Sequence, residues 1–294
     1  MPLHENTLLV SLHMKQISVS RKDTDVSNKV TEQHHARKAA GAFHKRLFTD
    51  DALKPFKLSF RAARKIHEKL TLPFEPGLRI LPASALEKYN RKIDNLAMDV
   101  ELDALDFRDC YDDHLAAARE MLGDMFDRDL YPEADEVTAA FAIEKNIIPM
   151  PTPKVINRFM PDEVRQTLEE QIGERMQRAE NAAREDLAKR ITTPLSALTE
   201  RLKDPNNVFR DSLVTNLTEI TNLIPTLNIT NDPALEAVRT DILANLNVEA
   251  ETLRTDLAAR ENAVRHAGRL VRRLNLPIGG NNTNTDQAPS AAAM

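Results

Sequence analysis

An apolar row with helical spacing runs through the second half of this chain of 294 residues and persists for about ten turns. Its members recur every three or four residues, which places them on one face of an α-helix. They are Val164, Leu168, Ile172, Met176, Ala179, Ala183, Leu187, Ile191, Leu198 and Leu202. An apolar face of this length needs other helices to cover it, so the sequence predicts a hairpin or bundle of long amphipathic helices.

The composition also favours helix over sheet. The chain contains only 7 glycines and no Trp, and aromatic residues make up 4%, whereas a sheet-rich fold uses more of them at its turns and pleats. Hydrophobic residues make up 41%, which is enough for a core. The predicted fold class is therefore mainly α, with a small β-sheet in the N-terminal half (α+β).

The sequence carries no sign of secretion or of membrane insertion. The single cysteine, Cys110, cannot form an internal disulfide, and the N-terminal residues lack the basic region of a signal peptide. No apolar run approaches the roughly 18 residues that a membrane span requires. We therefore expect a soluble, cytoplasmic protein that does not contact a membrane.

Three segments of the N-terminal half are predicted to form a small sheet. Thr7–Val19 alternates between apolar and polar residues, and Leu78, Ile80 and Leu81 are the apolar residues of a second short strand. Phe141–Met150 contains adjacent β-branched residues, and the prolines that follow exclude a helix there. We expect this third segment to pair with the N-terminal strand.

The remaining periodic segments are predicted to be helices. In the N-terminal half they are Val26–Leu47, Asp51–Leu70, a long helix from Ser84 to Leu122 that Gly123 ends, and Glu133–Ala140. Ser84 and Glu87 have the spacing of a capping box. In the C-terminal half they are Asn206–Leu223 and a last stretch that Asp232 and Pro233 open. The predicted domains are an α+β module (1–158), a long-helix hairpin or bundle (159–276) and a disordered tail (277–294).

Charge is distributed unevenly along the chain. Between Arg21 and Lys69 there are thirteen basic and six acidic residues, and between Glu87 and Glu136 six basic and sixteen acidic ones. We favour an interpretation in which these two regions lie against each other in the fold. The alternative is a nucleic-acid-contacting face. Its candidate contacts are Lys38, Lys45, Arg61 and Arg64, together with Arg265, Arg269, Arg272 and Arg273 near the end of the last helix.

No catalytic, cofactor or metal site is predicted. His34, His35, His44 and His67 lack the helical spacing that would let them share an ion. Cys110 and His114 are four residues apart on a predicted helix, but no second pair completes a metal shell. We interpret them as a half-buried thiol beside a solvated acidic face. Glycine-rich phosphate loops and nucleophile elbows are also missing from the sequence.

Several stretches resemble an uncharacterised family found in bacteriophages and bacterial mobile elements. The main similarity lies in Leu202–Leu217 (LKDPNNVFRDSLVTNL) and Leu223–Pro233 (LIPTLNITNDP). It extends to Leu9–Leu12, Leu72–Phe74, Arg79–Ala83 and Leu122–Phe126. Members are often encoded near a MoxR/CobS-like AAA+ ATPase and a protein with a von Willebrand factor A-type domain. The resemblance implies a genomic context and these two partners, but no catalytic residues.

These features lead to one main functional hypothesis and two alternatives. The main hypothesis is a non-enzymatic adaptor or structural subunit that acts with an AAA+ ATPase in DNA metabolism through helix-mediated contacts. A nucleic-acid binder that uses the basic helices at 21–69 is the second hypothesis, and an enzyme with a site at Asp109–His114 is the third. Exposed helical seams also predict self-association into a homo-oligomer.

Overall fold

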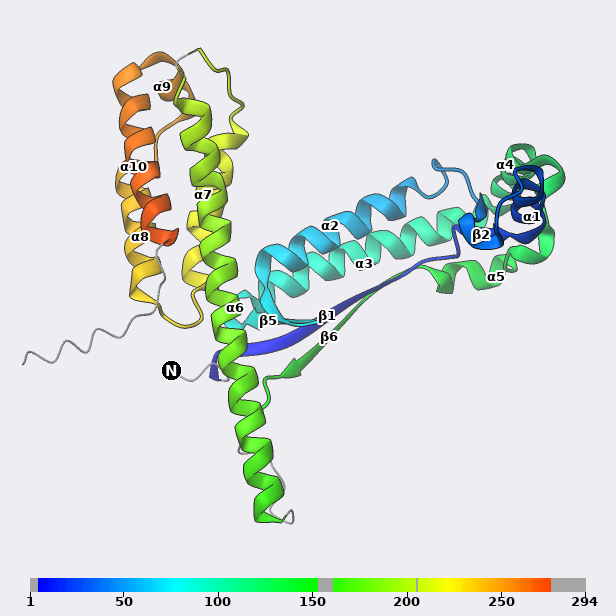
Figure 1. Ribbon diagram of the computed structural model, residues 1–294, viewed down its shortest axis with the longest axis horizontal. Helices are drawn as coiled ribbons and strands as arrows, with labels where there is room; N and C mark the ends of the chain where they lie inside the picture. The colour runs from blue at the N-terminus through cyan, green and yellow to red at the C-terminus, as the bar shows by residue number, and fades with distance from the viewer. Residues whose placement is uncertain (1–4, 153–160, 205, 276–294) are drawn as a thin grey trace, which may run out of the picture. The chain divides into compact units, whose positions relative to one another are not determined.

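The computed structural model describes residues 5–152, 161–204 and 206–275 (Figure 1). The chain divides into two compact units, residues 1–183 and 184–294, and the division falls inside the long helix α6 (Asp162–Leu202). The predicted boundary at 158 lies before this helix, and the predicted disordered tail lies outside the described residues. The predicted fold class is confirmed, because the chain is mainly helical and its four-stranded sheet lies in the first unit.

The sheet has the antiparallel strand order β4–β5–β1–β6. Its strands are β4 (Leu72–Glu75), β5 (Leu78–Pro82), β1 (Thr7–Lys15) and β6 (Ala142–Pro149). The fully buried centre of β1 pairs with both neighbours, since Leu9 lies opposite Ile80 of β5 and Ile148 of β6. The predicted pairing of the Phe141–Met150 segment with the N-terminal strand is therefore confirmed.

Two helices of the first unit, α2 (Lys54–Leu70) and α3 (Leu86–Asp109), lie side by side (Figure 1). Helix α2 contacts β1 and α3 contacts β6, so both helices pack on the sheet. Aromatic rings fill the space beneath them, and those of Phe56 and Phe141 stack with their centroids 3.7 Å apart. Further members of this cluster are Phe48, Phe107, Tyr111 and Tyr131.

The predicted helix from Ser84 to Leu122 is wrong in two details. It is two helices, because α3 ends at Asp109 and α4 (Tyr111–Leu122) begins after a break at Cys110. The hydroxyl of Tyr111 donates a 2.8 Å hydrogen bond to the carbonyl of Pro132, which fixes the start of α4. Ser84 does not cap α3, since it lies in a 3-10 turn and Ala85 occupies the N-cap position. Gly123 ends α4 as predicted, with a φ of 53°.

The predicted helix Val26–Leu47 is wrong in its second half. Helix α1 (Thr24–Gln33) ends early, and the chain passes through the 3-10 turn η2 (Lys38–Ala40) into β3 (Phe43–Arg46), which pairs with β2 (Ser20–Asp23). The cause is a Schellman-type helix end. The N–H of Ala36 bonds to the carbonyl of Thr31 at 2.8 Å, and His35 takes a left-handed conformation with a φ of 49°.

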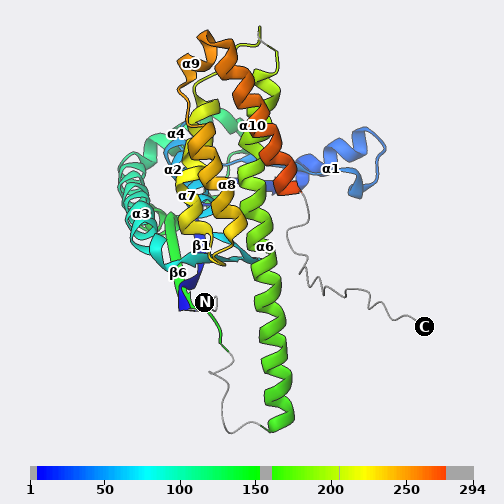
Figure 2. The same cartoon turned by 90° about the vertical axis from the view of Figure 1, so that its left-hand side faces the viewer.

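The second unit is a helical bundle, as predicted (Figures 1 and 2). It is built from the end of α6, α7 (Ser212–Leu227), α8 (Pro233–Asn245), α9 (Ala250–Thr255) and α10 (Leu257–Asn275). Its core includes Leu187, Ile191, Leu198 and Leu202 of the predicted apolar row. Asp232 caps α8 by accepting the N–H of Ala234 at 2.8 Å, which confirms the predicted start of that stretch. Among the described helices, none is long and apolar enough to cross a membrane.

Candidate functional site

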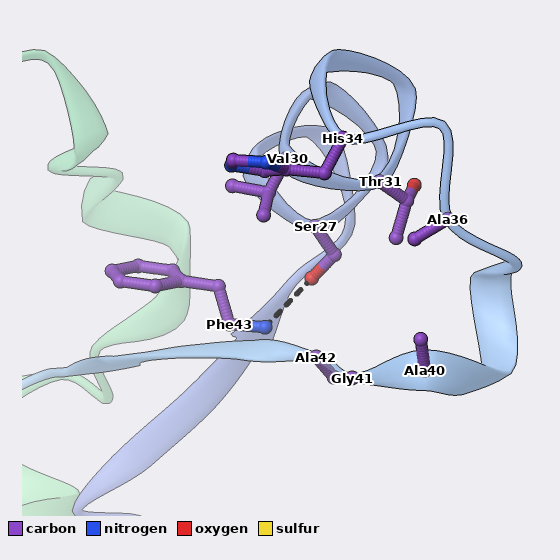
Figure 3. Close-up of a pocket in the computed structure, with 9 residues that line it drawn as sticks. All are labelled: Ser27, Val30, Thr31, His34, Ala36, Ala40, Gly41, Ala42 and Phe43. Atoms are coloured by element: carbon purple, nitrogen blue, oxygen red, sulfur yellow. Dashed lines mark hydrogen bonds between the residues drawn. The ribbon is translucent and has the colours of Figure 1, made fainter.

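An open pocket of about 340 Å³ lies between α1 and the chain that leads into β3 (Figure 3). We call residues 20–46, which contain β2, α1, η2 and β3, the α1 segment. Small and apolar side chains dominate the lining of this pocket, which is formed by Ser27, Val30, Thr31, His34, Ala36, Ala40, Gly41, Ala42 and Phe43. The early end of α1 creates the pocket, because a continuous helix would carry these residues away from one another.

Polar contacts at the base of the α1 segment hold the two walls of the pocket together. Asp23 caps α1 by accepting the N–H of Val26 at 3.0 Å. This bond, with the nearby Lys45 ammonium, holds the pKa of the Asp23 carboxyl below its usual range. Ser27 lies on α1, and its hydroxyl accepts the N–H of Phe43 at 2.9 Å (Figure 3). These contacts fix the walls of the pocket in the folded chain.

Two large apolar side chains of the pocket remain in contact with solvent. Val30 is 47% exposed and Phe43 is 39% exposed. Covering the remaining surface of each would contribute about 1 kcal/mol. Between Lys29 and Phe43 the chain has three basic residues and one acidic residue, so the surroundings of the pocket are basic. This combination suits an apolar side chain that a partner presents among acidic residues.

The structure removes one of the predicted nucleic-acid contacts. Lys45 is only 9% exposed, and its Nζ donates a 2.8 Å hydrogen bond to the carbonyl of Met125 and lies 3.3 Å from Asp23. It is therefore a structural lysine, and its inclusion among the contacts was wrong. Lys38, Arg61 and Arg64 are exposed, but Lys38 lies in η2 whereas the two arginines lie on α2.

A basic groove between α2 and α3 was missed by sequence reasoning. We call it the lysine groove: a hollow of about 210 Å³ lined by Lys65, Ile66, Lys69, Leu70, Lys88 and Lys92. Lys88 and Lys92 belong to a region in which acidic residues outnumber basic ones, so the regional charge count concealed them. Their spacing of four residues at the start of a helix was the available signal.

The four predicted arginine contacts on α10 are all exposed. Arg265, Arg269, Arg272 and Arg273 share one face, because their spacings of four, three and one residues keep them within an arc of about 100° around the helix. Arg272 and Arg273 lie in the last turn of α10, where the negative end of the helix dipole stabilises cations. The helix dipole is therefore a sufficient structural reason for these two arginines.

The residues at Asp109–His114 do not form a nucleophile–base pair. Cys110 is exposed at the break between α3 and α4, and the bond that joins it to His114 runs from the His114 N–H to the Cys110 carbonyl at 3.1 Å. The His114 ring packs against Phe107 with centroids 4.3 Å apart, and burial lowers the pKa of this histidine. Within the described ranges, no group of three or more His, Cys, Asp or Glu side chains could hold a metal ion.

The histidines that were considered as metal ligands have other surroundings. His34, His35 and His44 are exposed in the α1 segment, and His34 lines its pocket. His67 lies on α2, beside a third open hollow of about 520 Å³ that the β4–β5 turn and Arg79 also line. Burial and the charge of Arg79 lower the pKa of His67 to about 4, so this histidine is neutral at physiological pH.

The turn at Phe209, which lies within the segment Leu202–Leu217 of the family resemblance, has a structural role. The ring of Phe209 is buried and lies near two guanidinium groups, with that of Arg254 at 5.1 Å and that of Arg260 at 5.8 Å from its centroid. Arg254 also pairs with Asp211, which occupies the N-cap position of α7 without capping through its side chain. The buried ring of Phe209 therefore anchors this turn.

In comparisons with protein-family models, curated protein sequences and solved structures, nothing matches this chain. Its function is therefore argued from the geometry of the described residues.

Proposed function

We propose that this chain is a non-enzymatic adaptor that binds a protein partner through the pocket of the α1 segment. The observation that carries this proposal is the exposure of Val30 and Phe43 at an apolar pocket of about 340 Å³. The hydrogen bond from the N–H of Phe43 to the hydroxyl of Ser27 joins the two walls and preforms the pocket, so little ordering of the chain opposes binding. Such a site holds an anchoring side chain rather than a small polar substrate.

The occupant that fits this pocket is an acidic amphipathic helix of a partner protein. An apolar side chain of that helix would enter between Val30 and Phe43, and its acidic residues would face Lys29, Arg37 and Lys38, which are exposed. Charges at the rim of an interface mainly guide association and orientation, whereas the buried anchor provides most of the affinity. We therefore expect binding that depends strongly on the anchor and moderately on salt.

The resemblance to the phage and mobile-element family supports particular partners for the first test. They are an AAA+ ATPase of the MoxR/CobS type and a protein with a von Willebrand factor A-type domain, which would act with this adaptor on DNA in the cytoplasm of a bacterial host. This part of the proposal rests on the resemblance alone, so it stands or falls separately from the pocket.

A binding experiment with three forms of the chain tests both parts. The wild-type chain, Val30→Glu/Phe43→Glu and the control Val208→Glu are each immobilised and exposed to the two partners. Val208 is the matched control because it is also apolar and is 91% exposed, but it lies in the second unit. We expect the wild type and the control to retain a partner and the pocket variant to lose at least tenfold in affinity.

The possible failures of this experiment are distinct. Recovery of neither partner by the wild type would contradict the partners that the resemblance implies. Equal binding by the wild type and the pocket variant would contradict the pocket. Light scattering on the chain alone, at several concentrations, shows whether a second copy occupies the pocket, since the pocket variant would then lose a dimer that the control retains.

A further inference from the structure

We infer that the lysine groove between α2 and α3 is a binding site for the phosphate groups of a nucleic-acid strand. This inference is independent of the proposed function, because it concerns other elements and another class of ligand. Two of the lysines, Lys65 and Lys69, come from the C-terminal half of α2, and Lys88 and Lys92 come from the first turns of α3. The two helices therefore run antiparallel and bring together basic ends that are separate in the sequence.

The groove combines a basic rim with an apolar floor. Lys65, Lys88 and Lys92 are exposed, and Lys69 is half-buried. Ile66 and Leu70 of α2 line the same hollow between the lysines. An apolar floor of this kind supports the aliphatic stems of lysines while their ammonium groups stay at the surface. No acidic side chain is among the residues that line this hollow, so its charged lining is entirely basic.

Each helix carries its lysines at a spacing that disfavours the free protein. Lys65 and Lys69 are four residues apart, as are Lys88 and Lys92. Like charges at this spacing destabilise a helix by about 0.2–0.5 kcal/mol a pair. Lys88 also lies in the first turn of α3, where the positive end of the helix dipole raises the energy of a cation. A bound anion offsets all of these costs together.

The arginine face of α10 differs from the lysine groove in its form. Its four arginines lie on one helix, whereas the groove brings lysines of two helices together around a hollow. A phosphate group in the hollow can therefore meet ammonium groups from both helices. This contrast is the reason why we assign the phosphate site to the groove and not to α10.

The form of the groove points to a strand backbone as its ligand. The hollow is open and lies along two helices, and Arg61 precedes Lys65 by one further helical turn on α2. Successive phosphates of a strand can therefore meet successive basic side chains. No aromatic residue lines the hollow, so bases have no stacking platform there. Binding should consequently depend on phosphate charge and salt, and little on base sequence.

Fluorescence anisotropy with the full chain tests this inference. The probes are a labelled single strand of thymidines and a labelled duplex of mixed sequence, each titrated at several salt concentrations. The test variant is Lys65→Glu/Lys92→Glu, which changes one lysine on each helix, and Lys65→Arg/Lys92→Arg is the conservative variant. The control is Arg269→Glu/Arg273→Glu, which makes the same change of charge on α10. Circular dichroism checks that every variant is folded.

We expect the groove variant to lose at least tenfold in affinity for either probe, while the conservative variant and the α10 control bind like the wild type. The slope of log affinity against log salt should fall by about two in the groove variant, about one for each lost phosphate contact. Absence of wild-type binding at low salt would overturn the inference, as would loss of binding in the α10 control alone. Equal competition by inorganic tripolyphosphate, at matched total phosphate, would contradict a strand as the ligand.

Discussion

The Nδ1 atom of His67 lies 2.8 Å from the hydroxyl oxygen of Tyr89, and this hydrogen bond joins α2 to α3. Tyr89 is fully buried, and burial raises the pKa of its hydroxyl. Burial also lowers the pKa of His67, to about 4, and the charge of Arg79 acts in the same direction. The histidine at the contact between the two helices that form the lysine groove is therefore neutral in the folded protein at physiological pH.

The stability of the first unit should fall as the pH falls from about 6.5 to about 4. His67 takes up a proton near pH 6.5 in the unfolded chain but only near pH 4 in the folded one, so the unfolded state binds more protons in this window. After allowance for solvent screening, we expect a loss of about 1–2 kcal/mol in the free energy of unfolding from this residue. Urea unfolding at pH 7, 5 and 4 measures it.

The variant His67→Gln separates this effect from that of other groups. It keeps a polar side chain beside Tyr89 but cannot be protonated, so the loss of stability between pH 6.5 and 4 should be smaller than in the wild type. His44→Gln is the matched control, because it removes a histidine that is exposed in the α1 segment. A pH profile of His67→Gln that parallels the wild type would contradict the assignment.

A second prediction concerns Arg260, which is 5% exposed in the second unit. Its guanidinium donates hydrogen bonds to the carbonyls of Leu202 at 3.0 Å, Asp204 at 2.6 Å and Asn207 at 3.1 Å. It therefore supplies hydrogen-bond donors to carbonyl groups at and after the end of α6, which have no partner within the helix. Arg260→Met leaves these carbonyls without that donor, and we expect it to cost about 2–4 kcal/mol in urea unfolding. The exposed Arg265→Met should change stability by less than about 0.5 kcal/mol. A similar small change for Arg260→Met would refute its role.

The elements that sequence reasoning predicted correctly are those with a local signal. Asp232 followed by Pro233 is a local start signal for α8, and Gly123 is a local stop signal for α4. The pairing of Phe141–Met150 with the N-terminal strand was predictable because both segments are extended and apolar. The helix end at His35 was missed because histidine seldom takes a left-handed conformation, whereas glycine would have indicated it.

The candidate sites depend on contacts between distant parts of the sequence, and so they were less predictable. The pocket needs the early end of α1 and the return of the chain to β3, both of which the prediction of one long helix had excluded. The lysine groove needs Lys65 and Lys92 to meet across two antiparallel helices. The charge counts of the sequence placed Lys65 in a basic region and Lys92 in an acidic one. Such counts contain no information on which helix faces become neighbours in the fold, so they did not predict the groove.

The helix end at His35 provides a third prediction. At a φ of 49°, glycine avoids the steric cost that a Cβ atom imposes, so His35→Gly should raise the free energy of unfolding by about 0.5–1 kcal/mol. His35→Val should lower it by about 1–2 kcal/mol, since branched residues tolerate this conformation poorly. Gly41→Ala serves as the control, because the backbone at Gly41 is extended and an added Cβ would meet open space. Equal stability of the His35 variants by thermal unfolding would contradict the Schellman assignment.

The interior position of Lys45 leads to the last prediction. Its Nζ bonds to the carbonyl of Met125 and lies near Asp23, so it ties the α1 segment to the chain after α4. Lys45→Ala removes this donor from a buried site and should lower the free energy of unfolding by about 1–3 kcal/mol. Lys38→Ala is the matched control, since Lys38 is exposed, and its effect should stay within about 0.5 kcal/mol. If Lys45→Ala instead preserved stability and weakened nucleic-acid binding, Lys45 would be a ligand contact after all.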